Sequence, residues 1–217
     1  ALPISRGVLD GVPVSIKDEF AVANYISGDG TSFLGQTPAS ADATAVARLR
    51  AAGALIVGKG QMHEIGLGVV GTSRAHGPAH NPYQPGHTAG GSSGGGAAAT
   101  ASGLATIALG ADGGGSIRVP AGFCGMVGLK GTYGRVSSYG TAGVVWSMSN
   151  PGPIAAHPAD VAAAYMAMAG VDANDPRTLN QPHPVAPDAT RRDLRSITIG
   201  YMPAWFEHAR SEEHTSE

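Results

Sequence analysis

The sequence contains a single cysteine, Cys124, so the chain cannot form an internal disulfide. A protein without disulfides is compatible with a reducing compartment, and we expect a cytoplasmic location. Long apolar runs are also missing. The nearest candidate, residues 97–109, is rich in small residues and falls short of transmembrane length. We therefore expect no integral membrane segment.

Charge is scarce as well. Charged residues make up 14% of the chain, the net charge is −2, and no long basic run occurs. Nucleic acids and anionic membranes are bound by strongly basic surfaces, so we expect neither as a partner. The length of 217 residues and the hydrophobic content of 42% favour one soluble globular domain.

Glycine, by contrast, is abundant and clustered. The chain has 33 glycines, and two clusters contain serine: residues 90–96 (GGSSGGG) and 110–118 (GADGGGSIR). Glycine allows sharp turns and the close approach of another backbone or a substrate. Three glycines directly before Ser116 also let successive N–H groups point the same way, which suits an oxyanion hole.

Residue periodicity predicts an α/β fold. Residues 12–17 alternate as in a strand, and residues 42–52 show a helical pattern that is followed at once by a strand at 54–57. Further helices are predicted from residue 92 to about 109 and at 158–169. Helix followed by strand indicates a mixed twisted central sheet flanked by helices.

The C-terminal part has a different character. Residues 171–195 are rich in Pro and Asp and are predicted to form an excursion or linker, and a strand is expected at 196–200. The last eight residues, 210–217, resemble the translation of a sequencing-library adapter. We therefore expect a single, incomplete domain over residues 1–209 and a non-native tail, with an ordinary polar tail as the alternative.

Several generic motifs compete for the glycine clusters. A phosphate-binding loop needs Lys and Ser or Thr where Ala97 and Ala98 stand. Residues 90–94 match the G-x-S-x-G elbow of α/β-hydrolases, but this match is easily made in glycine-rich sequence. His63 lacks a second zinc-ligating histidine, because Leu67 occupies its place. A purely structural glycine turn stays open for either cluster alone.

Together, the clusters resemble the amidase signature family. The resemblance rests on residues 90–137, which contain GGSSGGG, GADGGGSIRVP and FCGMVGLKGTYGRVS, and on GVPVSIKDEF at 11–20. Gly131, where the family usually has proline, and Gly113 depart from the pattern. The resemblance covers the chain from about Leu9 to about Asp175.

The resemblance implies a serine amidase without metal or organic cofactor. Ser116 matches the acylated nucleophile, Ser92 the relay serine that follows a cis peptide bond, and Lys17 the base. The backbone N–H groups expected to bind the oxyanion are those of Gly113, Gly114, Gly115 and Ser116. Loop-supporting roles are expected for Ser93, Asp112 and Arg118.

Elementary chemistry agrees with this assignment of the base. A serine hydroxyl is a weak nucleophile and needs an adjacent base, and no histidine has an evident acidic partner. Lys17 ends an apolar strand and is one of three lysines. Burial of the side chain would disfavour its ammonium form and make it a base. The alternative is a surface lysine paired with Asp18 or Glu19.

The resemblance extends to one branch of the family. Residues 61–68 (QMHEIGLG) are similar to the fatty acid amide hydrolase-like branch, which implies a small-molecule N-acyl amide substrate and places Leu67 along the acyl channel. A core leucine is the alternative for Leu67. Residues 132–140 (TYGRVSSYG) also resemble the glutaminase subunit of tRNA-dependent amidotransferases, which implies partner subunits. A homodimer and an inactive remnant of such an enzyme both stay open.

Overall fold

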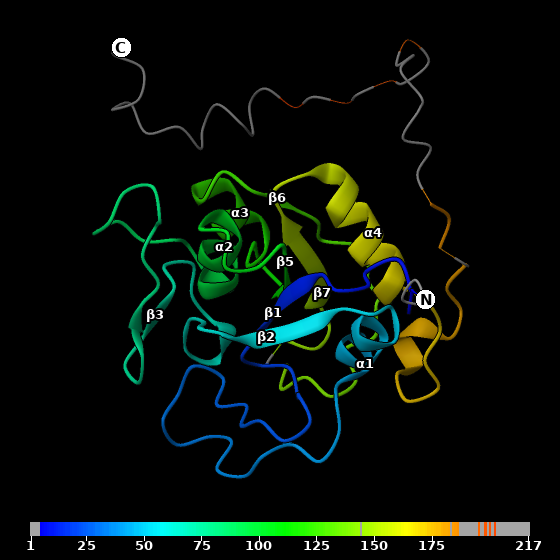
Figure 1. Cartoon of the computed structure of the whole chain (residues 1–217), viewed down its shortest axis with the longest axis horizontal. Helices are drawn as coiled ribbons and strands as arrows, with labels where there is room; N and C mark the ends of the chain where they lie inside the picture. Colours follow the sequence, from blue (N-terminus) through cyan, green and yellow to red (C-terminus); the bar gives the residue numbers. More distant parts are fainter. Residues whose placement is uncertain are drawn as a thin grey trace. The chain divides into compact units, whose positions relative to one another are not determined.

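The computed structural model describes residues 5–143, 145–182 and 184–186, together with residues 195, 198, 200 and 202. Residues 1–186 form one compact unit, and all the helices and strands labelled in Figure 1 lie within it. The strand expected at 196–200, apart from residues 198 and 200, and the tail expected at 210–217 lie outside the described residues.

A five-stranded mixed sheet forms the centre of this unit. Its strand order is β2-β1-β5-β7-β6. The strands are β1 (Pro13–Lys17), β2 (Leu55–Gly60), β5 (Ile107–Asp112), β7 (Asn150–Ala155) and β6 (Val127–Gly128). β1 is parallel to both β2 and β5, whereas β7 is antiparallel to both β5 and β6. The sheet confirms the predicted α/β architecture.

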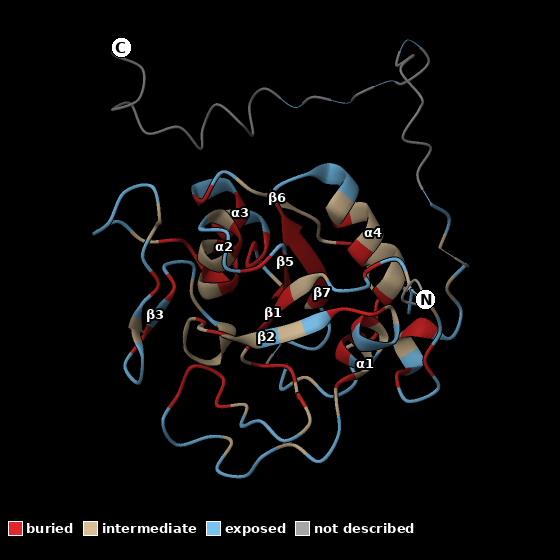
Figure 2. Ribbon diagram, viewed as in Figure 1, coloured by how far each residue is buried: buried red, intermediate tan, exposed pale blue. Residues whose placement is uncertain are grey.

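Helices cover both faces of the sheet (Figure 1). They are α1 (Thr44–Ala51) and α4 (Pro158–Met168) on one face and α2 (Gly94–Ala101) and α3 (Arg118–Phe123) on the other. Side chains alternate between the two faces of a strand, so β5 contributes Ile107 and Leu109 to one hydrophobic core and Ala108 to the other. Figure 2 shows β5 and β7 buried between these layers.

The same alternation decides where Lys17 points. Val14 and Ile16 of β1 are buried in the core formed with α1 and α4. Ser15 and Lys17 therefore point to the opposite face, toward α2. The buried end of β1 thus brings an amine beside the glycine-rich segment that precedes α2.

The predicted helices are confirmed in part. The predictions for α1 and α4 hold with small shifts at their ends. The helix predicted to continue from residue 92 to about 109 is wrong beyond Ala101. Gly103 adopts a left-handed backbone (φ 76°) that terminates α2, and the chain then enters β5.

Strand β7 was not predicted, because Pro151 and Pro153 argue against a central strand. The structure accommodates both. The Pro153 carbonyl accepts a hydrogen bond from the Leu129 N–H at 3.1 Å, so this residue directs its backbone polar groups away from β5. In an antiparallel strand, the backbone polar groups of residues two apart point to the same neighbouring strand, so those of Pro151 also point away from β5. The N–H groups that the two prolines lack would therefore not have bonded to β5, and the hydrogen bonds between β5 and β7 stay intact.

The linker prediction is wrong for residues 171–182, which pack on the same unit. The buried Asp172 accepts a hydrogen bond from the Ser137 hydroxyl at 2.6 Å, and Asp175 accepts one from the Ser138 N–H at 2.8 Å. A 3₁₀ turn, η2 (Pro176–Thr178), lies in this segment. These bonds tie it to the loop that follows β6.

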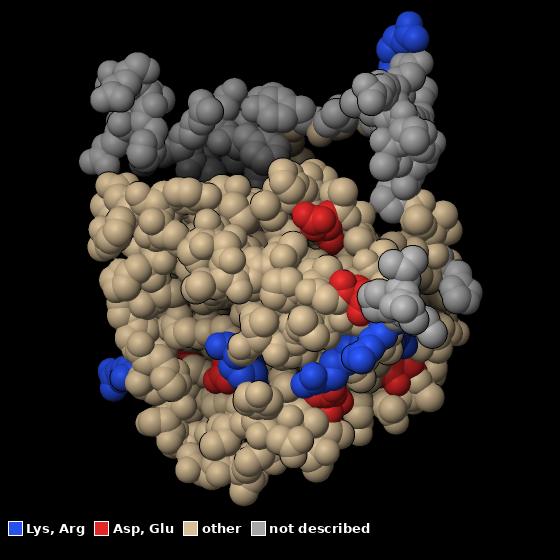
Figure 3. Space-filling view, in the orientation of Figure 1, with Lys and Arg blue, Asp and Glu red and all other residues tan. Residues whose placement is uncertain are grey.

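The remaining described elements are short. They are the 3₁₀ turn η1 (Glu64–Gly66) and the two-residue strands β3 (Thr72–Ser73) and β4 (Gly77–Pro78). On the face seen in Figure 3, basic side chains lie next to acidic ones and do not form a patch of one sign. Among the described helices, none is long and apolar enough to cross a membrane.

Candidate active site

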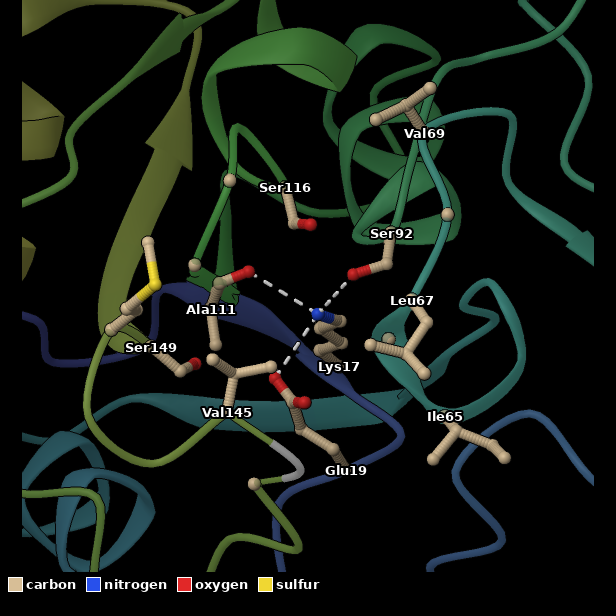
Figure 4. A pocket seen from close by; sticks show the side chains of 16 residues that line it. Lys17, Glu19, Ile65, Leu67, Val69, Ser92, Ala111, Ser116, Val145 and Ser149 are labelled. Carbon is tan, nitrogen blue, oxygen red and sulfur yellow. Dashed lines mark hydrogen bonds and ion pairs between the residues drawn. The ribbon is translucent and has the colours of Figure 1, made fainter.

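The Lys17 side chain ends β1 inside the protein. It is 3% exposed, which rules out the surface-lysine interpretation. Its Nζ donates hydrogen bonds to the Ser92 Oγ at 2.7 Å and to the Ala111 carbonyl at 3.3 Å (Figure 4). Two residues that are 75 positions apart in the sequence are thereby joined through their functional groups.

The segment around Ser92 is fixed by its backbone. The Gly91–Ser92 peptide bond is cis, as the family resemblance implies. The Ser92 carbonyl accepts a hydrogen bond from the His63 N–H at 3.1 Å, and the Ser93 N–H donates one to the Ser116 carbonyl at 3.1 Å. The segment around Ser92 and the Ser116 loop are therefore connected directly, through the Ser93 backbone.

Asp112 anchors the loop that carries Ser116. This fully buried carboxylate accepts hydrogen bonds from the Gly115 N–H at 2.7 Å and the Ile117 N–H at 3.1 Å. It also receives two bonds from the Arg118 guanidinium, each at 3.0 Å. Burial raises the pKa of the Asp112 carboxyl, but the bonds from Arg118 and the backbone outweigh it and lower that pKa overall. The ionised carboxylate thus holds the turn.

The structure divides the four predicted oxyanion donors. Gly113, Gly114 and Ser116 line a cavity, and none of their three N–H groups has an acceptor among the described residues. The N–H of Gly115, also predicted as a donor, is bound to the Asp112 carboxylate in this structure. Gly115 turns the chain in a conformation (φ 126°) that favours glycine.

The cavity has a volume of about 280 Å³. Ser92, 1% exposed, and Ser116, 8% exposed, both line it, and Figure 4 shows their hydroxyls facing the same space. Its walls include the apolar side chains of Ile65, Leu67, Val69, Val145 and Met148. Leu67 is 64% exposed at the mouth of the cavity, so the alternative of a core leucine is wrong.

Two acidic residues near the amine were missed as site residues. Glu19 lines the cavity, is 7% exposed and forms an ion pair with Lys17 at 3.1 Å. Asp29 is 5% exposed, and its pKa is raised to about 6 by burial, then by Glu19 and by Asp18. Sequence reasoning named Glu19 only as a partner for a surface lysine. Its position two residues after Lys17 was the available indication.

The arrangement has defined chemical capacities. A buried amine contacts one hydroxyl, a second hydroxyl lines the same cavity, and unpaired backbone N–H groups lie beside it. Such a set can pass a proton between hydroxyl and amine and can stabilise a negatively charged oxygen. Within the described ranges, no three His, Cys, Asp or Glu side chains gather as a metal-binding group.

Comparison with known proteins gives relatives from more than one branch. The chain is 44% identical over 200 residues to a subunit of the glutamyl-tRNA(Gln) amidotransferase of Natronomonas pharaonis, covering 91% of this chain and 47% of that protein. It is 38% identical over 211 residues to fatty acid amide hydrolase of Medicago truncatula, covering 95% and 35% respectively. The chain thus spans less than half the length of these relatives.

Solved structures give the same grouping. The peptide amidase of Stenotrophomonas maltophilia superimposes with a TM-score of 0.80 at 39% identity, over 84% of this chain and 38% of that one. The sequence matches the family described as Amidase over residues 4–215. Fold, serine loops and sequence similarity agree, and the chain belongs to the amidase signature family.

Proposed function

We propose that this chain carries the catalytic centre of an amidase that hydrolyses carboxamide bonds through an acyl-enzyme on Ser116. The observation that carries the proposal is the 2.7 Å contact between Lys17 Nζ and Ser92 Oγ, in a cavity that Ser116 also lines. A serine nucleophile needs a base within hydrogen-bonding reach, directly or through one relay group. Ser92 occupies the relay position.

The cycle begins with the neutral amine of Lys17. Lys17 accepts the Ser92 proton while Ser92 accepts the Ser116 proton, and Ser116 Oγ attacks the carbonyl carbon of the amide. The negative oxygen binds the N–H groups of Gly113, Gly114 and Ser116. The proton returns through Ser92 to the leaving nitrogen as the C–N bond breaks.

Hydrolysis of the acyl-enzyme then uses the same groups in reverse order. Water gives a proton through Ser92 to Lys17 and attacks the Ser116 ester. Collapse of the second tetrahedral intermediate breaks the ester bond and returns the proton to Ser116 Oγ. The products are a carboxylic acid and an amine, and the three side chains regain their starting protonation.

The cavity supports an N-acyl amide with an apolar acyl group as substrate. Its apolar walls suit a hydrocarbon chain, with a few polar groups at the reacting carbon. Leu67, at the mouth, then contacts the part of the chain that leaves the cavity. The similarity to fatty acid amide hydrolases of plants agrees with this substrate class.

A glutaminase subunit of a tRNA-dependent amidotransferase is the second candidate. It is favoured by the 44% identity to the Natronomonas pharaonis protein. Glutamine carries an ammonium and a carboxylate, whereas Lys17 and Glu19 are the charged side chains that line the cavity in the described part of the chain. Recognition of glutamine would therefore depend on residues elsewhere in the whole protein.

A turnover assay on the whole protein separates the candidates. We expect release of acid from N-acyl amides that rises with acyl chain length, and loss of that release in a Lys17→Ala variant. Ammonia release from glutamine that is insensitive to acyl length and requires partner subunits would select the second candidate. A folded protein that acts on neither substrate and takes no serine-directed probe would be an inactive remnant of the family.

A further inference from the structure

The Lys17 amine has two neighbouring oxygens besides that of Ser92, although a general base needs only the hydroxyl that gives up its proton. Its Nζ donates to the oxygens of Ser92 and Ala111, and the Glu19 Oε1 lies 3.1 Å away on another side. Figure 4 shows these three oxygens around the nitrogen. Within the described residues, Glu19 Oε1 accepts no hydrogen bond, so the carboxylate is held near Lys17 by charge.

The protonation state of Lys17 decides how many of these three oxygens its N–H groups can bind. An ammonium has three N–H groups and no lone pair, whereas a neutral amine has two N–H groups and one lone pair. Lys17 can accept a proton only when its lone pair faces the Ser92 Oγ. Two other acceptors must then occupy the two remaining N–H groups. The Ala111 carbonyl and Glu19 Oε1 are the oxygens placed to do so.

We propose that Glu19 is a positioning residue for Lys17, which aims the amine lone pair at Ser92 and sets the pH above which the site reacts. The proposal rests on the assignment of Lys17 as the base. In the protonated enzyme, the Glu19 carboxylate favours the ammonium. Once the amine is neutral, the same carboxylate accepts one of its N–H groups and fixes its rotation.

Other charged groups act on the same pair. Asp29, on the loop after β1, interacts with both members of the pair, and Lys59 on β2 interacts with Glu19; Asp18 acts in turn on Asp29 and Lys59. On η1, the Glu64 carboxylate is occupied by the Arg74 N–H. Asp29 is linked to the cavity wall, because its carbonyl accepts the Ile65 N–H at 2.9 Å. Burial, Glu19 and Asp18 raise the pKa of Asp29 to about 6, so near pH 7 its negative charge adds to that of Glu19.

The rate of labelling of Ser116 by a fluorophosphonate, measured against pH on the whole protein, tests this without knowledge of the substrate. Glu19→Gln removes the charge but keeps an oxygen acceptor. We expect its rate to rise at a pH lower by about 1 unit or more, with a plateau within about fivefold of wild type. Glu19→Ala removes the acceptor too, and its plateau should fall by about tenfold or more. The exposed Asp10→Asn is the matched control and should change neither quantity.

An unchanged midpoint in a folded Glu19→Gln protein would overturn the proposal, as would equal plateaus in Glu19→Gln and Glu19→Ala. A merely structural glutamate would lower both plateaus without moving the midpoint. Should the Glu19 variants fail to fold, Asp29→Asn is the second probe: its profile should shift to lower pH by about 0.5 unit and coincide with wild type below about pH 6. No shift there would also overturn it. Absence of wild-type labelling is a different failure, because it removes the proposed function itself.

Discussion

A buried lysine, Lys17, and a half-buried one, Lys59, lie on neighbouring strands and differ in what surrounds their amines. Lys59 of β2 lies beside Ile16 of β1, one residue from Lys17. The Lys59 Nζ donates to the carbonyls of Asp18 at 2.9 Å and Phe20 at 2.6 Å, and it has two further partners. Lys17 has two hydrogen-bond acceptors, one of them the Ser92 hydroxyl, and an ion pair with Glu19, and it lines a cavity.

The difference separates a lysine whose hydrogen bonds hold a loop from the lysine that we propose as the base. Burial lowers the pKa of Lys59, and the charge and hydrogen bond of Asp18 offset part of that effect. Loss of a proton from Lys59 would leave a buried acceptor without its donor, which costs free energy. The Ser92 hydroxyl that Lys17 contacts can donate as well as accept a hydrogen bond, so this pair can exchange a proton. Partner chemistry, and not burial alone, decides which amine is a base.

Two carboxylates repeat the contrast. Asp112 has both oxygens bound by Arg118 and backbone N–H groups, and its pKa is lowered overall. Asp29 has a buried Oδ1 without a hydrogen-bond partner among the described residues, and its pKa is raised to about 6. Lys59 and Asp112, whose polar atoms are hydrogen-bonded, hold loops in place. Glu19 and Asp29, each with a buried oxygen that has no hydrogen-bond partner among the described residues, lie around the amine that we propose as the base.

The strongest test exchanges each lysine for methionine. Lys17→Met should reduce the rate of Ser116 labelling by about 10³-fold across about pH 6–9, because the proton acceptor is lost. Lys59→Met is the matched control and should stay within about fivefold of wild type per folded molecule. Comparable losses of labelling rate in the two variants would contradict the claim that Lys17, and not Lys59, accepts the proton.

Lys59→Met, which should change the labelling rate little, should clearly lower the stability of the fold. Lys59→Met leaves the carbonyls of Asp18 and Phe20 and the Ser27 hydroxyl without their donor, and should lower the free energy of unfolding by about 3 kcal/mol. Urea denaturation at neutral pH measures this loss. A loss below about 1 kcal/mol would show that water replaces the ammonium and that Lys59 does not hold the loop.

Asp112→Asn should cost about 2 kcal/mol at neutral pH, because a charge-assisted network around the Ser116 loop is weakened. The folded-state pKa of Asp112 is lowered. Its contribution is therefore fully present above the unfolded-state value of about 3.9 and is lost as the pH falls through the folded-state value. Denaturation of wild type and variant from neutral to acidic pH checks the sign: a gap that widens on acidification contradicts the assignment.

Asp29→Asn should have the smallest effect and the opposite sign. Its raised pKa means that ionisation of Asp29 destabilises the fold as the pH rises from about 4 to 6. We expect the variant to be about 1 kcal/mol more stable than wild type at pH 8 and equal to it below about pH 4. Asparagine also tolerates the left-handed backbone of this position (φ 52°). A less stable variant at pH 8 would show a hidden partner for the carboxylate.

The sequence predicted the elements whose periodicity is clear. Alternation fixed β1, and helical spacing fixed α1 and α4. The Ala- and Gly-rich stretch after Ser92 lacks such periodicity, so the transition from α2 to β5 was not visible. Strand β7 was missed because its prolines suit a central strand only when their missing N–H groups face away from its main ladder.

The site was predicted unevenly for a related reason. Family motifs identified Lys17, Ser92 and Ser116, although no local pattern shows that residues so far apart meet. Glu19 lies in the quoted segment 11–20, but its contact with Lys17 depends on tertiary packing, and no motif marks the walls formed by Val145 and Met148. The bond between the Gly115 N–H and Asp112 could not be predicted either, because only the folded loop shows it.

The central claim, that Ser116 is the nucleophile of an assembled site, is tested most directly by a fluorophosphonate probe. The whole protein and its Ser116→Ala variant are treated side by side, and the labelled peptide is identified by mass spectrometry. We predict labelling at Ser116 that disappears in the variant, while both proteins melt cooperatively. A folded wild-type protein that takes no label, or a label that survives in Ser116→Ala, would contradict the account.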